Sequence, residues 1–188
     1  MTCIWERSFA EFAGPGIHYP SDTMRIDDGE AAAIVAELAA REHVPTVLRP
    51  TGAQRGYSIG HVAGTPHTLL LADKRVVGFY AGSYLWIERR HRGCGLATPL
   101  ILAAAHNRGG TVLPPGVVFQ GFTGRGLRAH RAAHRHAVRS AIVAGQPVPP
   151  AVIAELEGHA SHRGHGSLSR QALPQSGHRP IDKGADTR

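Results

Sequence analysis

The stretch from residue 85 to residue 101 constrains this chain more than any other. Its sequence is LWIERRHRGCGLATPLI: an apolar, β-prone start, a basic middle with two glycines, and the first residues of a helix. A strand that turns through glycines into a helix brings several backbone N–H groups to one point, where the positive end of the helix dipole favours an anion. Glycine also lets a ligand approach the backbone closely. The stretch therefore predicts a phosphate-binding loop between a strand and a helix.

The spacing within this stretch narrows the prediction. Arg92, Gly95 and Ala97 form the pattern R-x-x-G-x-A, which resembles the pyrophosphate loop of the GNAT-type N-acetyltransferases, Q/R-x-x-G-x-G/A. The flanks agree with the family as well. Ile87 lies five residues before the arginine, where the family ends its central strand, and the apolar pair 100–101 lies in the following helix.

Two other interpretations of the stretch stay open. A second register, R-x-x-G-x-G over residues 90–95, also satisfies the bare pattern, but it does not place both flanks. The stretch could also be a solvated basic turn that joins a core strand to a core helix.

The resemblance implies an acyl-CoA-dependent N-acyltransferase, with acetyl-CoA as the donor co-substrate and no metal. The acetyl group would pass to an amine by direct attack in a ternary complex, and the acceptor would be a small-molecule or peptide amine. In the family, the strand before the loop splays from its neighbour and its backbone holds the pantetheine arm. The cofactor-binding residues implied here are Leu85, Trp86, Ile87, Arg92, Gly93, Cys94, Gly95, Leu96 and Ala97.

Acyl transfer to an amine needs a group that takes a proton from the amine and a proton for the departing thiolate. Candidate bases near the loop are Glu88, Tyr84 and His91; Glu88 adjoins three arginines and could instead only neutralise them. The family often places an acid tyrosine in its last helix, but this chain has no tyrosine after Tyr84. His134 is the candidate to replace it.

The sequence departs from the family just before the loop. Only eight residues separate Gly78 from Ile87, fewer than the family usually has between the corresponding strands. We expect either two very short strands or one bent strand over 75–88 with Gly82 at a bulge.

The remaining patterns predict an α/β (α+β) fold: a GNAT-like mixed, mostly antiparallel sheet flanked by helices on both faces. The β-prone runs 67–72 and 75–80, separated by a short polar turn, predict a hairpin, and residues 117–120 predict a later strand. Asp27 and Glu30 have the spacing of a capping box at the start of an early helix. The helices expected from periodicity and end signals are 31–42, 96–107, 127–143 and 151–156, while 44–64 is expected to be a loop-rich connection near the acceptor entrance.

We expect one domain over residues 1–157 and a disordered, basic, histidine-rich tail over 158–188. The tail has few large apolar residues and cannot offset the entropy of ordering. Neither Cys3 nor Cys94 lies in a C-x-x-C pair. No signal-peptide pattern and no apolar run of about 18–20 residues are present, so we expect a soluble, cytoplasmic protein without a membrane partner. A homodimer is left open.

Charge supports a polyanionic ligand and also supports a rival function. The net charge is +7, and no acidic residue occurs between Glu88 and Glu155. The arginines of that interval are Arg89, Arg90, Arg92, Arg108, Arg125, Arg128, Arg131, Arg135 and Arg139. The last four of these arginines have helical spacing and could contact a phosphate backbone together. The rival function is therefore a nucleic-acid-binding module without catalysis, and nucleic acid is the less favoured partner.

Two histidines raise the question of a metal. His130 and His134 lie four residues apart on one predicted helix, a spacing that can hold a metal ion. No Cys, Asp or Glu lies nearby to complete a usual site. We therefore expect no metal and place both histidines on a basic, solvent-facing helix.

Overall fold

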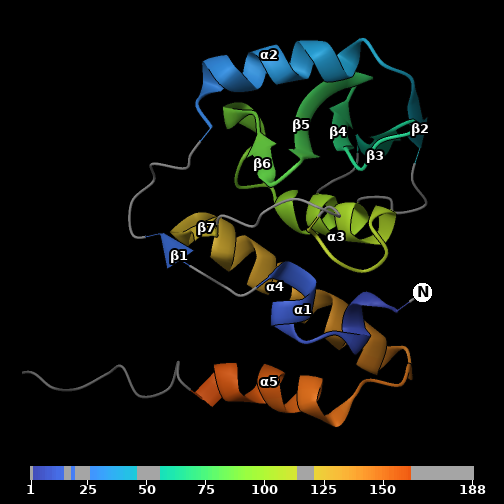
Figure 1. The fold of residues 1–188 in the computed structure, drawn as a ribbon, viewed down its shortest axis with the longest axis vertical. Helices are drawn as coiled ribbons and strands as arrows, with labels where there is room; N and C mark the ends of the chain where they lie inside the picture. Colours follow the sequence, from blue (N-terminus) through green and yellow to red (C-terminus); the bar gives the residue numbers. More distant parts are fainter. Residues whose placement is uncertain (1, 15–17, 20–25, 46–55, 114–120, 162–188) are drawn as a thin grey trace, which may run out of the picture.

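A five-stranded antiparallel sheet forms the centre of the structure, which is a computed structural model. The structure describes residues 2–14, 18–19, 26–45, 56–113 and 121–161. The strands run in the order β2–β3–β4–β5–β6, as Figure 1 shows. Their bounds are β2 His43–Pro45, β3 Tyr57–Val62, β4 Thr68–Ala72, β5 Arg75–Ala81 and β6 Tyr84–Ile87.

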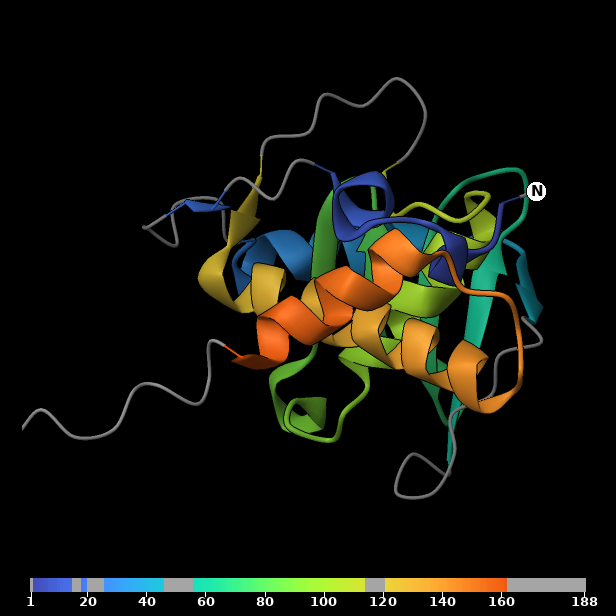
Figure 2. The same cartoon turned by 90° about the horizontal axis from the view of Figure 1, so that it is seen from below.

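Helices cover both faces of this sheet. Helix α2 (Asp28–Ala39) lies on one face, and α3 (Ala97–Asn107) lies on the other with α4 (Gly124–Val143) packed against it (Figure 1). Helix α5 (Pro150–Ser161) crosses the outer side of α4, which is clearest in Figure 2. The N-terminal turn η1 (Ile4–Glu6) and helix α1 (Phe9–Ala13) also pack on α4.

Three short elements complete the chain. Strand β1 (His18–Tyr19) pairs in parallel with β7 (Phe122–Thr123), away from the five-stranded sheet. The turn η4 (Arg89–His91) follows β6. The sheet is thus antiparallel in its main part and has helices on both faces, which agrees with the expected α/β class at that coarse level. Among the described residues, no helix has the length and apolarity needed to cross a membrane.

Several local predictions are confirmed. The hairpin over 67–80 is present as β4 and β5, joined at Asp73 and Lys74, which both have positive φ, as a tight hairpin turn requires. The capping box at α2 is present: an Asp27 oxygen accepts from the Glu30 N–H at 2.7 Å, and Glu30 accepts from the Asp27 N–H at 3.1 Å.

The segment before the loop forms two strands, so the bent-strand alternative is wrong. Strands β5 and β6 are joined by a turn at Gly82, which has a φ of 56°. The irregularity in strand pairing lies instead in β4, between Leu70 and Leu71.

Other boundaries need correction. The expected loop over 44–64 contains β3, whose Ile59 and Val62 are buried. Helix α4 begins at Gly124 and not at residue 127, because the Thr123 side chain accepts a hydrogen bond from the Gly126 N–H and caps the helix. Helix α5 continues to Ser161, so the expected boundary at 157 falls inside a helix. The strand expected at 117–120 lies outside the described residues.

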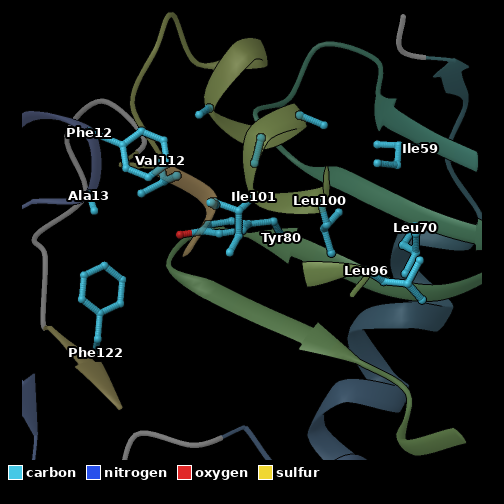
Figure 3. Close-up of a cluster of buried hydrophobic side chains, with 14 of the residues drawn as sticks. Phe12, Ala13, Ile59, Leu70, Tyr80, Leu96, Leu100, Ile101, Val112 and Phe122 are labelled. Atoms are coloured by element: carbon cyan, nitrogen blue, oxygen red, sulfur yellow. The ribbon is translucent and has the colours of Figure 1, made fainter. Parts of the chain in front are cut away.

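The apolar side chains form two clusters, one on each face of the sheet. The larger lies between the sheet, α3, α4 and α1, and Figure 3 shows Phe12, Tyr80, Leu100, Ile101 and Phe122 from it. The smaller lies under α2. Leu85 and Ile87 of β6 pack against the larger cluster and Trp86 against the smaller, as the two-residue period of a strand requires.

A buried arginine, Arg108, connects three segments of the chain through its hydrogen bonds. The Arg108 guanidinium donates hydrogen bonds to the carbonyls of Pro66 (3.0 Å), Gly82 (3.2 Å) and Val112, and more weakly to that of Tyr80. It also lies 4.7 Å from the centre of the Tyr80 ring. Burial lowers the pKa of this guanidinium.

Replacement of this arginine tests its structural role. Arg108→Met removes every one of these donors and leaves buried carbonyls without them, so we expect the free energy of unfolding to fall by about 3 kcal/mol. Urea unfolding measures this. Arg128→Met, at an exposed position of α4, is the control and should change stability by less than about 0.5 kcal/mol. Equal losses in the two variants would contradict the role assigned to Arg108.

Candidate cofactor cleft and active site

A cleft of about 280 Å³ lies between β6 and the start of α4. One wall consists of residues 83–87, and the other consists of 121–123 with Arg125, Gly126, Ala129 and His130; Ile26 and Arg92 complete the lining. The cleft therefore lies between β6, which precedes the predicted loop, and β7 with the start of α4, which follow α3 in the chain.

The cleft exists because β6 is the last strand of the five-stranded sheet, and β7 pairs with β1 instead of with β6. The register of β6 follows from the Glu88 N–H, which donates to the Val77 carbonyl at 2.9 Å. Backbone groups of alternate residues in an antiparallel pair point to opposite sides. The N–H and C=O groups of Leu85 and Ile87 therefore point away from β5, toward the cleft side of the strand.

The predicted loop follows at the end of this strand. Gly93 and Gly95 have φ values of 83° and 72°, a region that glycine adopts without strain. Helix α3 begins at Ala97, one residue after the expected start. Leu96 precedes it and has no side-chain oxygen for the first N–H groups, whereas α2 and α4 are capped by Asp27 and Thr123. Cys94 is an exposed free thiol in the loop.

The Arg92 side chain is held at the edge of the cleft. Its Nε donates to the Ile87 carbonyl at 2.6 Å, and its terminal nitrogen lies 3.1 Å from Oδ1 of Asp28, at the start of α2. The Trp86 indole N–H donates to the same oxygen at 3.2 Å. Asp28 thereby connects α2 to two residues of the predicted site.

Two buried side chains, Phe122 and His130, lie against each other in the cleft, with ring centres 4.4 Å apart. The His130 Nδ1 lies 2.8 Å from the Gly126 carbonyl and its Nε2 lies 2.8 Å from the Tyr80 hydroxyl. A carbonyl only accepts, so Nδ1 carries the proton, and in the neutral ring Nε2 accepts from the tyrosine.

The protonation states of this pair follow from its burial. Burial lowers the pKa of His130 from 6.5 to about 4, so the imidazole is neutral near pH 7. Burial also raises the pKa of Tyr80 above its ordinary value. Near pH 7 both side chains are therefore neutral, and both ring nitrogens of His130 are hydrogen-bonded.

The three predicted catalytic residues lie in different places. Tyr84 is exposed and lines the cleft. Glu88 does not line it; its carboxylate forms ion pairs with Arg90, one of the three adjoining arginines, at 3.0 Å and with Arg75 of β5 at 2.6 Å. His134 lies one turn beyond His130 and also does not line it.

His134 has a structural environment of its own. Its Nε2 donates to the Arg7 carbonyl at 2.8 Å, and its ring packs against Phe9 and Phe12. It borders a hollow of about 20 Å³ between α4 and α5, which shares no lining residue with the cleft. The Nδ1 atom of His91, the other candidate base, lies 2.8 Å from the Tyr57 hydroxyl, and His91 does not line the cleft.

The expectation that His130 and His134 face solvent is wrong, whereas His136 of the same helix is exposed. His130 is 2% and His134 5% exposed. Both lie on the buried stripe of the helix, which contains Leu127, His130, Ala133, His134, Ala137, Val138 and Ala141. This helical spacing was visible in the sequence and was the signal that could have placed them inside. Among the described residues, no group of three potential metal ligands comes together.

The arginines of α4 do not form one open row. Arg128 and Arg139 are exposed. Arg131 and Arg135 border the hollow under α5 together with Glu155, and the Arg131 guanidinium lies 5.5 Å from the centre of the Phe9 ring. Helix α5 thus covers part of the surface that the nucleic-acid interpretation needs.

No model of a known protein family matches this chain, and neither a curated protein nor a solved structure matches it significantly.

The buried histidine of the cleft predicts how stability depends on pH. The pKa of His130 is lower in the folded protein, about 4, than in the unfolded chain, so the unfolded state binds the proton first. The free energy of unfolding should therefore fall as the pH drops from 6.5 to 4, by about 3 kcal/mol from this residue.

Urea unfolding at a series of pH values measures this dependence. His130→Gln should be less stable at pH 8 but should lose less stability between pH 6.5 and 4. His136→Gln, at an exposed position of the same helix, should retain the wild-type loss. If His130→Gln loses as much stability between pH 6.5 and 4 as the wild type does, the assignment of a buried, neutral imidazole at position 130 is contradicted.

Proposed function

We propose that this protein is an acyl-CoA-dependent N-acyltransferase that transfers an acetyl group from acetyl-CoA to an amine. The observation that carries the proposal is the cleft beside β6, lined by Leu85, Trp86 and Ile87 of an outward-facing strand edge and by Arg92. Residues 93–97 do not line the cleft, but they continue the chain from Arg92 through the glycine loop into α3. The loop supplies what a pyrophosphate needs, and the strand edge supplies what an amide-containing arm needs.

The donor would lie along β6. Its pyrophosphate would rest on the N–H groups of the loop and of the first turn of α3, near Arg92. The two amides of its pantetheine arm are suited to the N–H and carbonyl of Leu85 and to the N–H of Ile87, because an extended chain beside a strand edge bonds as an added strand would. The Ile87 carbonyl already accepts a hydrogen bond from Arg92. The remaining charge is favourable as well, since Arg89, Arg90 and Arg125 are exposed around the cleft and loop.

The reaction joins the acceptor nitrogen to the thioester carbonyl carbon and breaks the carbon–sulfur bond, while the nitrogen loses a proton and the sulfur gains one. In this cleft, Tyr84 is the predicted catalytic residue that lines the space directly. His130, neutral and engaged at both ring nitrogens, contributes shape and a low-polarity wall. The acceptor class remains an amine, small or peptidic.

The rival function, nucleic-acid binding along the arginines of α4, has less support. Arg131 and Arg135 pack beneath α5, and only Arg128 and Arg139 of the row are exposed. A helix that tracks a phosphate backbone needs its guanidiniums on one open face.

A substitution in the loop tests the proposal. Gly95→Val adds a branched side chain where the pyrophosphate would approach, so we expect CoA binding to weaken by at least about tenfold, or roughly 1.4 kcal/mol. Isothermal titration calorimetry with CoA and acetyl-CoA measures this.

The matched control separates obstruction from backbone strain. Gly64 lies in the turn between β3 and β4 with a φ of 69°, against 72° at Gly95, and a Cβ there meets no atom within 4 Å. Gly64→Val should suffer similar strain and still bind CoA as the wild type does. Well-folded wild-type protein that binds no CoA would refute the proposed function.

A double variant separates the two functions. The side chains of Arg131 and Arg135 lie outside the cleft, so Arg131→Ala with Arg135→Ala should leave CoA affinity within about twofold of the wild type. Nucleic-acid binding would weaken in the double variant for any sequence and would fall steeply with salt. If the double variant loses CoA binding while a folded Gly95→Val keeps it, the site lies elsewhere.

A further inference from the structure

The wall opposite β6 contains two buried side chains, Phe122 and His130, which we call the floor of the cleft. Phe122 is 7% and His130 2% exposed, whereas every other lining residue is at least partly exposed. Because a lining residue that is almost fully buried must lie at the inner limit of the space, these two rings mark where the cleft stops.

The floor is held in place from behind. Both ring nitrogens of His130 are hydrogen-bonded, to Gly126 and to Tyr80, at 2.8 Å each. The Tyr80 ring in turn lies under the Arg108 guanidinium. A ligand that pushed the imidazole aside would break two hydrogen bonds, of which the one to Tyr80 is buried, and this is costly in a low-dielectric interior. The floor is therefore a fixed wall and not a movable side chain.

The floor lies near the strand position farther from the phosphate loop. Tyr80, which is hydrogen-bonded to His130, pairs with Leu85 of β6. The end of β6 that leads to the loop is at Ile87, whose carbonyl accepts a hydrogen bond from Arg92. A donor whose pyrophosphate rests on the loop and whose arm follows β6 would bring its acyl end to this floor.

We infer that the floor of Phe122 and His130 restricts the donor to short acyl groups, acetyl or propionyl, and makes these two residues specificity-determining. This inference rests on the proposed function. The neutral imidazole and the phenyl ring accept a small apolar group, but a longer chain would need to displace well-packed atoms. Such overpacking weakens binding by about tenfold or more.

Calorimetry with CoA, acetyl-CoA and hexanoyl-CoA tests the inference without knowledge of the acceptor. In the wild type, Kd for hexanoyl-CoA should be at least about tenfold higher than Kd for acetyl-CoA. Equal Kd values for the two thioesters would overturn the inference.

Two variants locate the restriction. Phe122→Ala enlarges the floor, so its ratio of Kd for hexanoyl-CoA to Kd for acetyl-CoA should fall at least about fivefold below the wild-type ratio. Phe9→Ala is the matched control: Phe9 is also 7% exposed and packs on a buried histidine of α4, His134, but it does not line the cleft. The control should keep the wild-type ratio.

Each result has one meaning. If Phe122→Ala does not fold, Phe122→Leu replaces it and should lower the ratio in the same direction by a smaller factor. An unchanged ratio in the folded Phe122 variant, or an equal change in Phe9→Ala, overturns the inference alone. Absence of CoA binding in the wild type refutes the proposed function, and the inference with it.

Discussion

Strand β6 is hydrogen-bonded to β5 along one edge, and its other edge faces a cleft because β7 pairs with β1 instead. The register fixed by the bond from the Glu88 N–H to the Val77 carbonyl turns the backbone groups of Leu85 and Ile87 toward that cleft. The loop with Gly93 and Gly95 continues from the same strand and leads into α3. In the proposed function, the strand edge binds the amides of the donor and the loop binds its phosphates, and the two are adjacent in the chain.

The opposite wall of the cleft depends on a chain of buried polar contacts. Arg108 satisfies carbonyls from three segments and lies over the Tyr80 ring, Tyr80 bonds to His130, and His130 packs on Phe122. Each polar group in this chain has a partner, as buried polar groups require. The first turns of α4 are thereby held at a fixed distance from β6. The same contacts that stabilise the fold therefore shape the candidate site.

The sequence allowed prediction of the elements whose signals are local. The hairpin of β4 and β5, the capping box of α2, and the strand, loop and helix around Gly95 all depend on residues close together in the chain.

Strand β3 was missed because its glycine-rich flanks are typical of loops, while its burial depends on pairing with β4. The spacing of His134 puts it on the buried stripe of α4, but it does not show which part of the protein covers that residue. Only the fold shows that His134 contacts Arg7 and α1 and does not line the cleft. The ion pairs of Glu88 and the bonds of Asp28 to Trp86 and Arg92 join distant segments, so spacing alone could not reveal them.

The central claim is that a donor binds along the outward edge of β6, and amide hydrogen exchange with and without CoA tests it most directly. The N–H groups of Leu85 and Ile87 face the cleft, while that of Trp86 belongs to the pair bonded to Phe79 of β5. Without CoA, Trp86 should be protected, and Leu85 and Ile87 should exchange faster. Saturating CoA should slow exchange at Leu85, Ile87 and the loop amides and leave Trp86 unchanged. Protection that appears only on the exposed arginines of α4, or nowhere along β6, would contradict the account.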